Sequence, residues 1–186
     1  ILGLFVRLFM YSFHDLANFW QQIILISSLL SIIIAAFTAL TQHKIKRFLA
    51  YSSIGHVGYL LIGLGTVTVE GVQGLLLYTL IYVGMTLNVW TFVLASEYLM
   101  RKGRAVYFTD LIGIGKSNPV LAITFTCTLL SMAGVPPLAG FISKMYIFFS
   151  AMQGGVFLVA LIGVLTSVVG AFYYLRFIKI IYFEKI

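Results

Sequence analysis

The chain has 186 residues, of which 61% are hydrophobic and only 9% are charged. Soluble domains carry about 25% charged residues, so this composition excludes a water-soluble globular fold and predicts an all-α membrane protein. The formal net charge is +7. The basic residues occupy short segments between apolar stretches, which is typical of membrane topology signals rather than of nucleic-acid binding.

The first half of the chain predicts one partial helix and three membrane spans. Residues 1–12 are apolar but too short to cross a bilayer, so we expect them to be the tail of a preceding helix. A polar turn follows at His14, Asp15 and Asn18. Stretches long enough for a membrane span, which needs about 20 apolar residues, then cover Phe19–Leu40, Phe48–Leu64 and Gly71–Leu99.

The segment Asn118–Met152 predicts a fourth span that is discontinuous. It is 35 residues long, too long for one straight span at about 1.5 Å per residue. Its middle contains Gly134, Pro136 and Pro137, and prolines remove backbone donors and clash with the preceding turn. The carbonyls freed by such a break must be satisfied by protein or by a wet cavity. A fifth span covers Val156–Phe183, which completes a single membrane domain over residues 1–186.

The charged residues support this count of five spans. Alternating the spans across the membrane places three basic groups on one side, and the opposite loops carry Asp15 and Glu70. This is the positive-inside pattern. The basic groups are Lys44, Lys46 and Arg47; Arg101, Lys102 and Arg104 with Lys116; and Lys179 with Lys185.

Lys144 is the first candidate functional residue. It lies seven residues after Pro137, in the second half of the broken helix. An ionisable residue inside a span costs about 2.5–3.5 kcal/mol on insertion scales and is therefore a functional candidate. The alternative is that its long side chain reaches the membrane interface. We expect a buried amine that carries protons reversibly.

His56 is the second candidate, about ten residues from the basic end of its span. Ser52, Ser53 and Tyr59 lie three or four positions away and so share its face of the helix. The alternative for this polar stripe is ordinary hydrogen bonding to a neighbouring helix. Because histidine titrates near neutral pH, the stripe also suits a proton relay.

Further polar stripes have the same two interpretations. One comprises Thr124, Thr128 and Ser131, and another comprises Tyr78, Tyr82 and Thr86. Either stripe could flank a hydrated path, although single Ser and Thr residues more often serve helix packing in membranes. Glu97 is expected to pair with Arg101 at i+4, or alternatively to admit protons.

No pattern in the sequence predicts a cofactor or a metal site. The single cysteine, Cys127, lies in an apolar run, so it supports neither a disulfide nor a metal centre. We therefore expect no redox chemistry in this chain itself.

Three stretches resemble the antiporter-like subunits of respiratory complex I (NADH:ubiquinone oxidoreductase), and within that family the chain 2 branch. They are LTQHKIKRFLAYSSIGHVGYLLIG at Leu40–Gly63, LLSMAGVPPLAGFISKMYIF at Leu129–Phe148, and FYYLRFIKIIYF at Phe172–Phe183. The resemblance implies two inverted five-helix repeats, each with a broken helix and a buried lysine on a hydrated axis. Residues 19–183 are similar to the second repeat.

The resemblance also implies roles for individual residues. Lys144 matches the buried lysine of the second broken helix, Lys46 and Arg47 match the basic pair that opens a helix, and His56 matches a histidine within it. The first repeat and the usual closing helix are absent from the sequence. We therefore expect a split subunit, completed by a separate chain that supplies the first repeat.

The resulting hypothesis is a proton-translocating membrane-arm subunit of complex I. Its expected partners are the other membrane-arm subunits and lipids, and its expected location is the mitochondrial inner membrane or, alternatively, a bacterial inner membrane. Two alternatives stay open: a structural membrane-arm segment whose relay has lapsed, and a subunit of a cation/proton antiporter.

Overall fold

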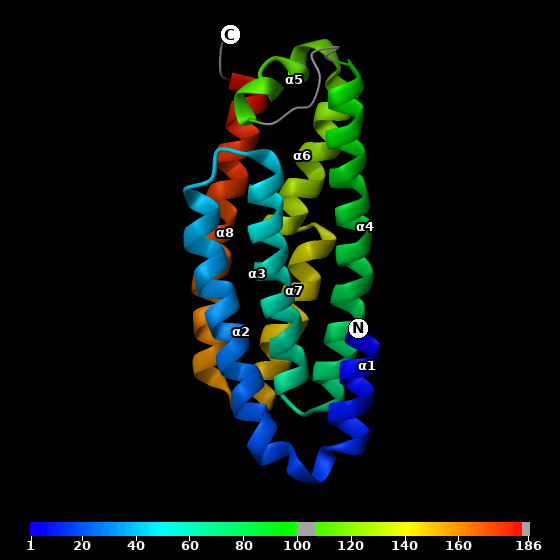
Figure 1. Ribbon diagram of the computed structural model, residues 1–186, viewed down its shortest axis with the longest axis vertical. Coiled ribbons are helices and arrows are strands. Elements are labelled where there is room, and N and C mark those ends of the chain that lie inside the picture. The colour runs from blue at the N-terminus through cyan, green and yellow to red at the C-terminus, as the bar shows by residue number, and fades with distance from the viewer. Residues whose placement is uncertain (100–106, 184–186) are drawn as a thin grey trace.

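The computed structural model describes residues 1–99 and 107–183, which form an elongated bundle of helices (Figure 1). In that part of the chain the structure has no β-strand, and one isolated bridge joins Lys44 to Tyr107. The longer helices are α2 (Ala17–Leu40), α3 (Ile45–Gly65), α4 (Val69–Leu99), α6 (Pro119–Ala133), α7 (Ala139–Gln153) and α8 (Phe157–Phe183). The short ones are α1 (Leu2–Arg7), a π-helical turn at Leu8–Ser12, α5 (Ile114–Ser117) and two 3₁₀ turns, η2 (His14–Leu16) and η3 (Phe108–Leu111).

Four of these helical segments are long and apolar enough to cross a membrane: His14–Leu40, Ile45–Gly65, Val69–Tyr98 and Phe157–Phe183. The prediction of an all-α membrane protein is confirmed. The segment predicted as a further, discontinuous span is divided between α6 and α7, which have 15 residues each. The predicted basic residues 101, 102, 104 and 185 lie outside the described residues.

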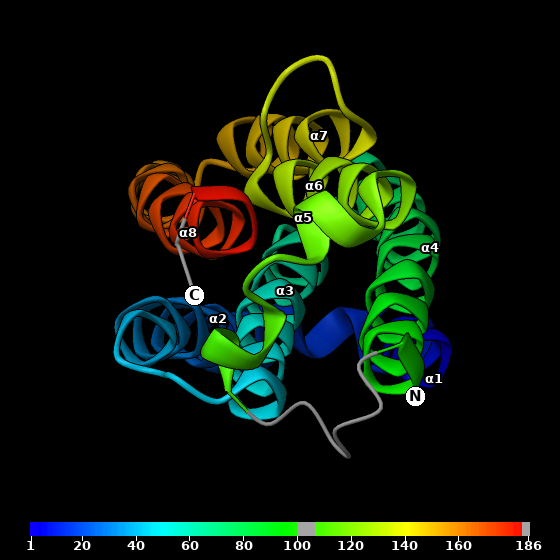
Figure 2. The same cartoon turned by 90° about the horizontal axis from the view of Figure 1, so that it is seen from above.

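Helix α3 lies at the centre of the bundle, surrounded by α2, α8, α6 with α7, and α4 (Figure 2). Burial agrees, because 61% of its most apolar window is buried, against 28–33% for the other three candidate spans. Small residues allow α2 to pack closely against α3; a side chain at Gly55 would contact Ala35 at 3.3 Å. Such small-residue contacts are a common basis of helix packing in membranes. The polar residues Ser52, His56 and Tyr59 on α3 are buried and are therefore shielded from lipid.

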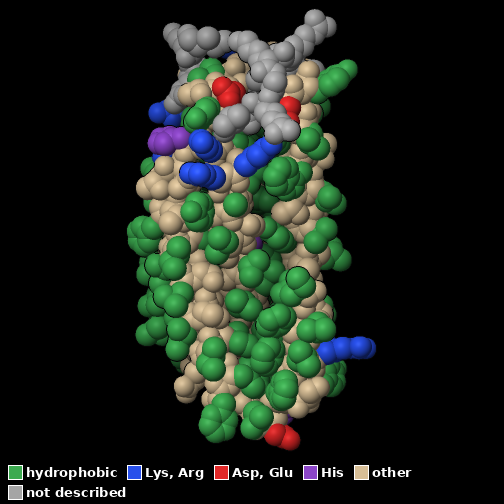
Figure 3. Space-filling model, viewed as in Figure 1, with side chains coloured by type: hydrophobic (Ala, Val, Ile, Leu, Met, Phe, Trp, Pro, Cys, Tyr) green, Lys and Arg blue, Asp and Glu red, His purple; other side chains and the backbone are tan. Residues whose placement is uncertain are grey.

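One end of the bundle is basic and is held together by aromatic packing. The α2–α3 loop, α5 and the end of α8 meet there (Figure 1), and Lys and Arg side chains gather at this end of the surface (Figure 3). Phe48 packs against Phe108, Tyr173, Tyr174 and Phe177 with ring centroids 5.4–5.9 Å apart. Edge-to-face geometry of this kind adds to the stabilisation from burial. It fixes α3 against α8 near the site described below.

The break between α6 and α7 is compact and closed by hydrogen bonds. Gly134 follows α6 with φ +87°, a left-handed conformation that glycine adopts without steric cost. The amide of Gly140, near the start of α7, donates to Ser131 Oγ at 3.0 Å. Pro136 and Pro137 lie between the two helices and are exposed. Ser131 thus joins the end of α6 to the beginning of α7.

Replacing Gly140 by alanine is expected to destabilise the protein. A Cβ atom there would collide with the backbone carbonyl of Ser131, and overpacking of this kind typically costs about 1–3 kcal/mol. The matched control is Gly84→Ala, where a Cβ would meet no atom within 4 Å and helix propensity improves by up to about 1 kcal/mol. Thermal unfolding in mild detergent measures both variants. Equal melting temperatures for the two variants would contradict the tight packing at the break.

Candidate functional site

Lys144 lies in the interior of the bundle and caps the end of α6. Its Nζ donates to the carbonyl oxygens of Met132 at 2.9 Å and of Ala133 at 3.1 Å. The last carbonyls of a helix have no partner within it, so the ammonium satisfies two groups that the break leaves open. The side chain is only 6% exposed. The side chain therefore does not extend to the outside of the bundle, as the alternative of reaching the membrane interface would require.

The Lys144 side chain lies close to two residues, Gly134 and Tyr59. A Cβ at Gly134 would lie 3.4 Å from Nζ and 3.1 Å from Cδ, so a glycine lets the lysine pass close to the backbone. On the other side Nζ lies 5.1 Å from the centre of the Tyr59 ring, within the range of a cation–π interaction. Tyr59 in turn contacts Thr166 Oγ1 at 3.3 Å through its hydroxyl. The ammonium is thus held by carbonyls and an aromatic face.

His56 is the centre of a chain of hydrogen bonds that connects three helices. Its Nδ1 lies 2.6 Å from the Tyr78 hydroxyl of α4, and its Nε2 lies 3.0 Å from the Tyr174 hydroxyl of α8. Tyr174 also hydrogen-bonds Ser52 Oγ, one turn before His56 on α3. A neutral imidazole has one donor and one acceptor nitrogen. The ring can therefore take a proton from one hydroxyl and give one to the other.

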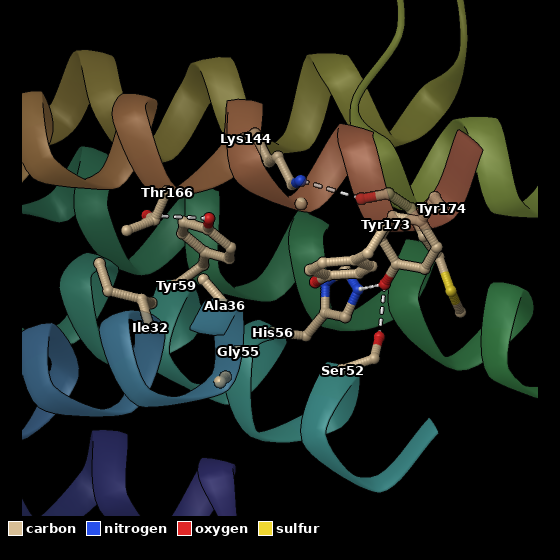
Figure 4. Close-up of a pocket in the computed structure, with 13 residues that line it drawn as sticks. Ile32, Ala36, Ser52, Gly55, His56, Tyr59, Lys144, Thr166, Tyr173 and Tyr174 are labelled. Carbon is tan, nitrogen blue, oxygen red and sulfur yellow. Dashed lines mark hydrogen bonds between the residues drawn. The ribbon is translucent and has the colours of Figure 1, made fainter. Parts of the chain in front are cut away.

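A small cavity joins the His56 chain to Lys144 (Figure 4). Its volume is about 10 Å³, close to the minimum of about 10–15 Å³ that holds one water molecule. Both candidate residues line it, from opposite sides. The other polar side chains of the lining are Ser52, Tyr59, Thr166, Tyr173 and Tyr174. A single water molecule there has enough polar partners to link the two residues.

A larger cavity of about 340 Å³ continues from this site toward the basic end. It is lined by Lys46, Ser52, Ser53, Tyr82 and Thr86, together with five mainly apolar residues. The two cavities share Ser52 and Met132. Polar side chains therefore extend along α3 from its first turn to its middle.

An ion pair lies at the start of this path. Lys46 Nζ is 3.6 Å from Glu97 Oε1, with side-chain exposures of 53% and 19%. Exposed pairs of this kind contribute at most about 1 kcal/mol to stability. The partner that we expected for Glu97, Arg101, lies outside the described residues. The structure therefore places Glu97 beside Lys46, at one end of the larger cavity.

Not every predicted residue belongs to this arrangement. The hydroxyl of Thr128 donates to Thr124 and Phe125 carbonyls of its own helix, at 2.9 and 2.8 Å, which fits the helix-packing alternative. Thr124 is exposed. Ser131 binds the backbone across the break instead of facing a cavity.

Two functional candidates escaped the sequence analysis: Tyr174 and Thr166. Both line the small cavity and hydrogen-bond residues of α3. A signal was present, because Thr166, Gly170, Tyr173 and Tyr174 lie at i, i+4, i+7 and i+8, on one face of α8. In residues 1–99 and 107–183 no three His, Cys, Asp or Glu side chains are grouped so that they could hold a metal ion.

The fold and the site define a multi-pass helical membrane protein with a polar path around a buried lysine and histidine. A family model described as NADH:quinone oxidoreductase/Mrp antiporter, transmembrane, matches residues 1–170. The chain belongs to this family, as the three sequence motifs predicted.

Individual members of this family are similar to the chain over nearly its whole length. The chain is 53% identical over 184 residues to NADH-ubiquinone oxidoreductase chain 2 of Marchantia polymorpha, covering 99% of this chain and 36% of that protein. It is 50% identical to NADH-quinone oxidoreductase subunit N of Rhodospirillum rubrum, covering 99% and 37%. A chain of respiratory complex I from Thermus thermophilus has a TM-score of 0.77 at 32% identity, over 88% of this chain and 36% of that one. The chain thus spans just over a third of the length of these relatives.

Proposed function

We propose that this chain is part of a proton-translocating membrane-arm subunit of a respiratory NADH:quinone oxidoreductase. In this role it exchanges protons at Lys144 and passes them along the His56 chain, without binding a redox cofactor of its own. Helices α6 and α7 form one discontinuous span, and residues 19–183 form one five-helix repeat. The location is an energy-transducing inner membrane, mitochondrial or bacterial, since relatives of both kinds are similar to the chain.

The observation that carries this proposal is that Lys144 and His56 line one cavity inside a membrane-spanning bundle. Burying an ionisable group at membrane depth is costly, and a purely structural lysine would be expected to pair with a carboxylate. Within the described residues no carboxylate forms an ion pair with Lys144. Its partners are backbone carbonyls and a tyrosine ring. These hold the ammonium but allow the amine to release its proton.

The chemistry of the proposed path follows from its side chains. Protons enter near the Lys46–Glu97 pair and pass through hydroxyls and water in the larger cavity to Ser52 and Tyr174. His56 exchanges protons with the Tyr174 hydroxyl at Nε2 and with the Tyr78 hydroxyl at Nδ1. A water molecule in the small cavity, which Tyr174 and Lys144 both line, then connects this chain to Lys144. Moving one charge against about 100 mV requires about 2.3 kcal/mol. Quinone reduction elsewhere in the complex supplies this free energy.

The relatives are longer than this chain, so the complete path needs residues outside it. We propose that the matching first repeat lies against this one, either in the same polypeptide or in a separate one. Purification of the tagged chain in mild detergent, followed by mass spectrometry and an assay of NADH:quinone activity, tests the assembly. Recovery of the chain without any subunit of such a complex would contradict the proposed function.

The variant Tyr174→Phe is expected to slow proton pumping roughly 3- to 10-fold, because it removes the hydroxyl between Ser52 and His56 while keeping the ring. Water in the cavities can bridge part of the gap, so the loss should be partial. The measurement is the initial rate of NADH-driven acidification in proteoliposomes that contain the assembled complex.

The matched control for this variant is Tyr146→Phe. This tyrosine lies two residues after Lys144 and is 40% exposed, outside the residues that line either cavity. Its hydroxyl should be dispensable for pumping. If both variants pump at the wild-type rate, Tyr174 is not part of the path.

A further inference from the structure

A third cavity, separate from the Lys144 site, lies at the basic end of the bundle. It has a volume of about 350 Å³ and is lined by His43, Tyr107, Phe108, Thr109, Arg176 and Ile180. None of these residues lines the two cavities of the proposed proton path. The cavity brings together the α2–α3 loop, η3 and α8. We call it the loop cavity.

The walls of the loop cavity are fixed by backbone contacts. The amide of Phe108 donates to the carbonyl of His43 at 3.2 Å, beside the bridge between Lys44 and Tyr107. The Lys44 ammonium lies 5.6 Å from the centre of the Tyr107 ring. These contacts hold the α2–α3 loop against η3. The cavity is therefore a built feature of this end of the protein.

The charge around the loop cavity is mainly positive. Arg176 donates from Nη1 to the carbonyl of Leu40 at 2.9 Å, which orients the guanidinium and uses one of its five N–H donors. His43 and Lys179 are exposed nearby. Asp110 is the neighbouring acid, and its carboxylate accepts the backbone amide of Tyr107 at 2.8 Å. A fork-shaped guanidinium with remaining donors is suited to binding a phosphate group.

The position of the loop cavity indicates an amphipathic ligand. Leu40 ends α2, and Arg176 is seven residues from the end of α8, so the cavity lies near the ends of two candidate membrane spans. One turn deeper, Phe172 on α8 is 63% exposed and Phe37 on α2 is 63% exposed. These side chains present apolar surface one turn further into the same two helices, and Phe172 shares the face of α8 that carries Arg176. A free anion would use only the upper part of this surface.

We propose that the loop cavity binds the phosphate headgroup of an anionic phospholipid, with Arg176 and His43 contacting the phosphate and the acyl chains lying along α2 and α8. The hydroxyl of Thr109 supplies a further donor. Basic pockets between membrane helices are a general means of recognising anionic lipids. Neutral zwitterionic lipids share the phosphate but lack the net charge, so they bind less tightly.

The test uses the assembled complex in nanodiscs that contain a photoactivatable phosphatidylglycerol. After illumination, mass spectrometry of peptides covering residues 37–43 and 172–180 measures labelling. We expect strong labelling of the wild type, weaker labelling with photoactivatable phosphatidylcholine, and a roughly 10-fold loss in Arg176→Gln, which is the size expected for one charge-assisted hydrogen bond. The matched control is Lys116→Gln, an equal change of charge at an exposed position of the same end, which should keep wild-type labelling.

Because Arg176 also binds the carbonyl of Leu40, a second variant, His43→Gln, tests the site without removing that contact. It should also reduce labelling. Equal labelling by both lipids, or unchanged labelling in both cavity variants, would overturn the proposal. Loss of labelling on addition of millimolar inorganic phosphate would show that the cavity serves a free anion rather than a lipid.

Discussion

Replacing His56 by glutamine is expected to leave the complex assembled but to slow proton pumping by about 10-fold or more. A glutamine amide can both donate and accept, as the neutral imidazole does between Tyr78 and Tyr174. It cannot accept a proton at one ring nitrogen and release one from the other, as an imidazole can. Since positioned acid–base groups typically accelerate proton transfer about 10²–10⁴-fold, the loss should be large. Proteoliposome acidification, divided by the rate of NADH oxidation, measures it.

The companion variant for this prediction is His56→Phe. Phenylalanine fills the space but removes the ring partner of both tyrosines. The Tyr174 hydroxyl keeps its bond to Ser52, whereas the Tyr78 hydroxyl loses the bond to His56, and a buried unsatisfied group costs about 1–3 kcal/mol. We therefore expect His56→Phe to lower the melting temperature and His56→Gln to preserve it. Normal pumping by a stable His56→Gln complex would show that the histidine is structural, which was the alternative for this residue.

Replacing Lys144 by alanine is expected to abolish pumping and also to destabilise the protein. The change removes the donor for the Met132 and Ala133 carbonyls, at a cost of about 1–3 kcal/mol for each group left unsatisfied. It also empties space beside Tyr59. Melting temperature, amount of assembled complex and pumping should therefore all fall. A complex that pumps normally with alanine at this position would support the structural alternative, a membrane-arm segment whose relay has lapsed.

The exposed lysine Lys116 provides the control for this loss of charge. It lies on α5 at the basic end, away from the residues that line the cavities of the proton path. Lys116→Ala should change neither melting temperature nor pumping. A comparable loss in both lysine variants would mean that the effect reflects net charge and not the position of Lys144.

The helices and the two principal candidates followed from local features of the sequence. Apolar stretches of sufficient length predicted the helical class, and the Pro136–Pro137 pair predicted the break. Lys144 and His56 stood out because ionisable groups are rare in spans. The boundaries of α3 were less predictable. The helix begins at Ile45 rather than Phe48, since the bridge from Lys44 to Tyr107, 63 residues away, fixes the chain before it.

Partners across the bundle could not be predicted in the same way. Tyr174 contacts His56 over 118 residues. The stripe from Thr166 to Tyr174 marks one face of α8, but the sequence does not indicate that this face turns toward α3. The hydrogen-bond partners of Ser and Thr hydroxyls were the hardest to predict from the sequence, because these side chains can also bond to carbonyls of their own helix. Thr128 does so, whereas Ser131 closes the break. Similar spacing thus led to different roles.

The most direct test of proton exchange at Lys144 is the number of protons moved per NADH oxidised in a complex that carries Lys144→Arg. Arginine keeps the charge and the donors that bind the end of α6, but it does not release its proton in proteins. Assembly and melting temperature should stay near the wild type, while the proton yield should fall. An unchanged proton yield in the assembled arginine variant would contradict proton exchange at this residue and would leave it only the role of capping α6.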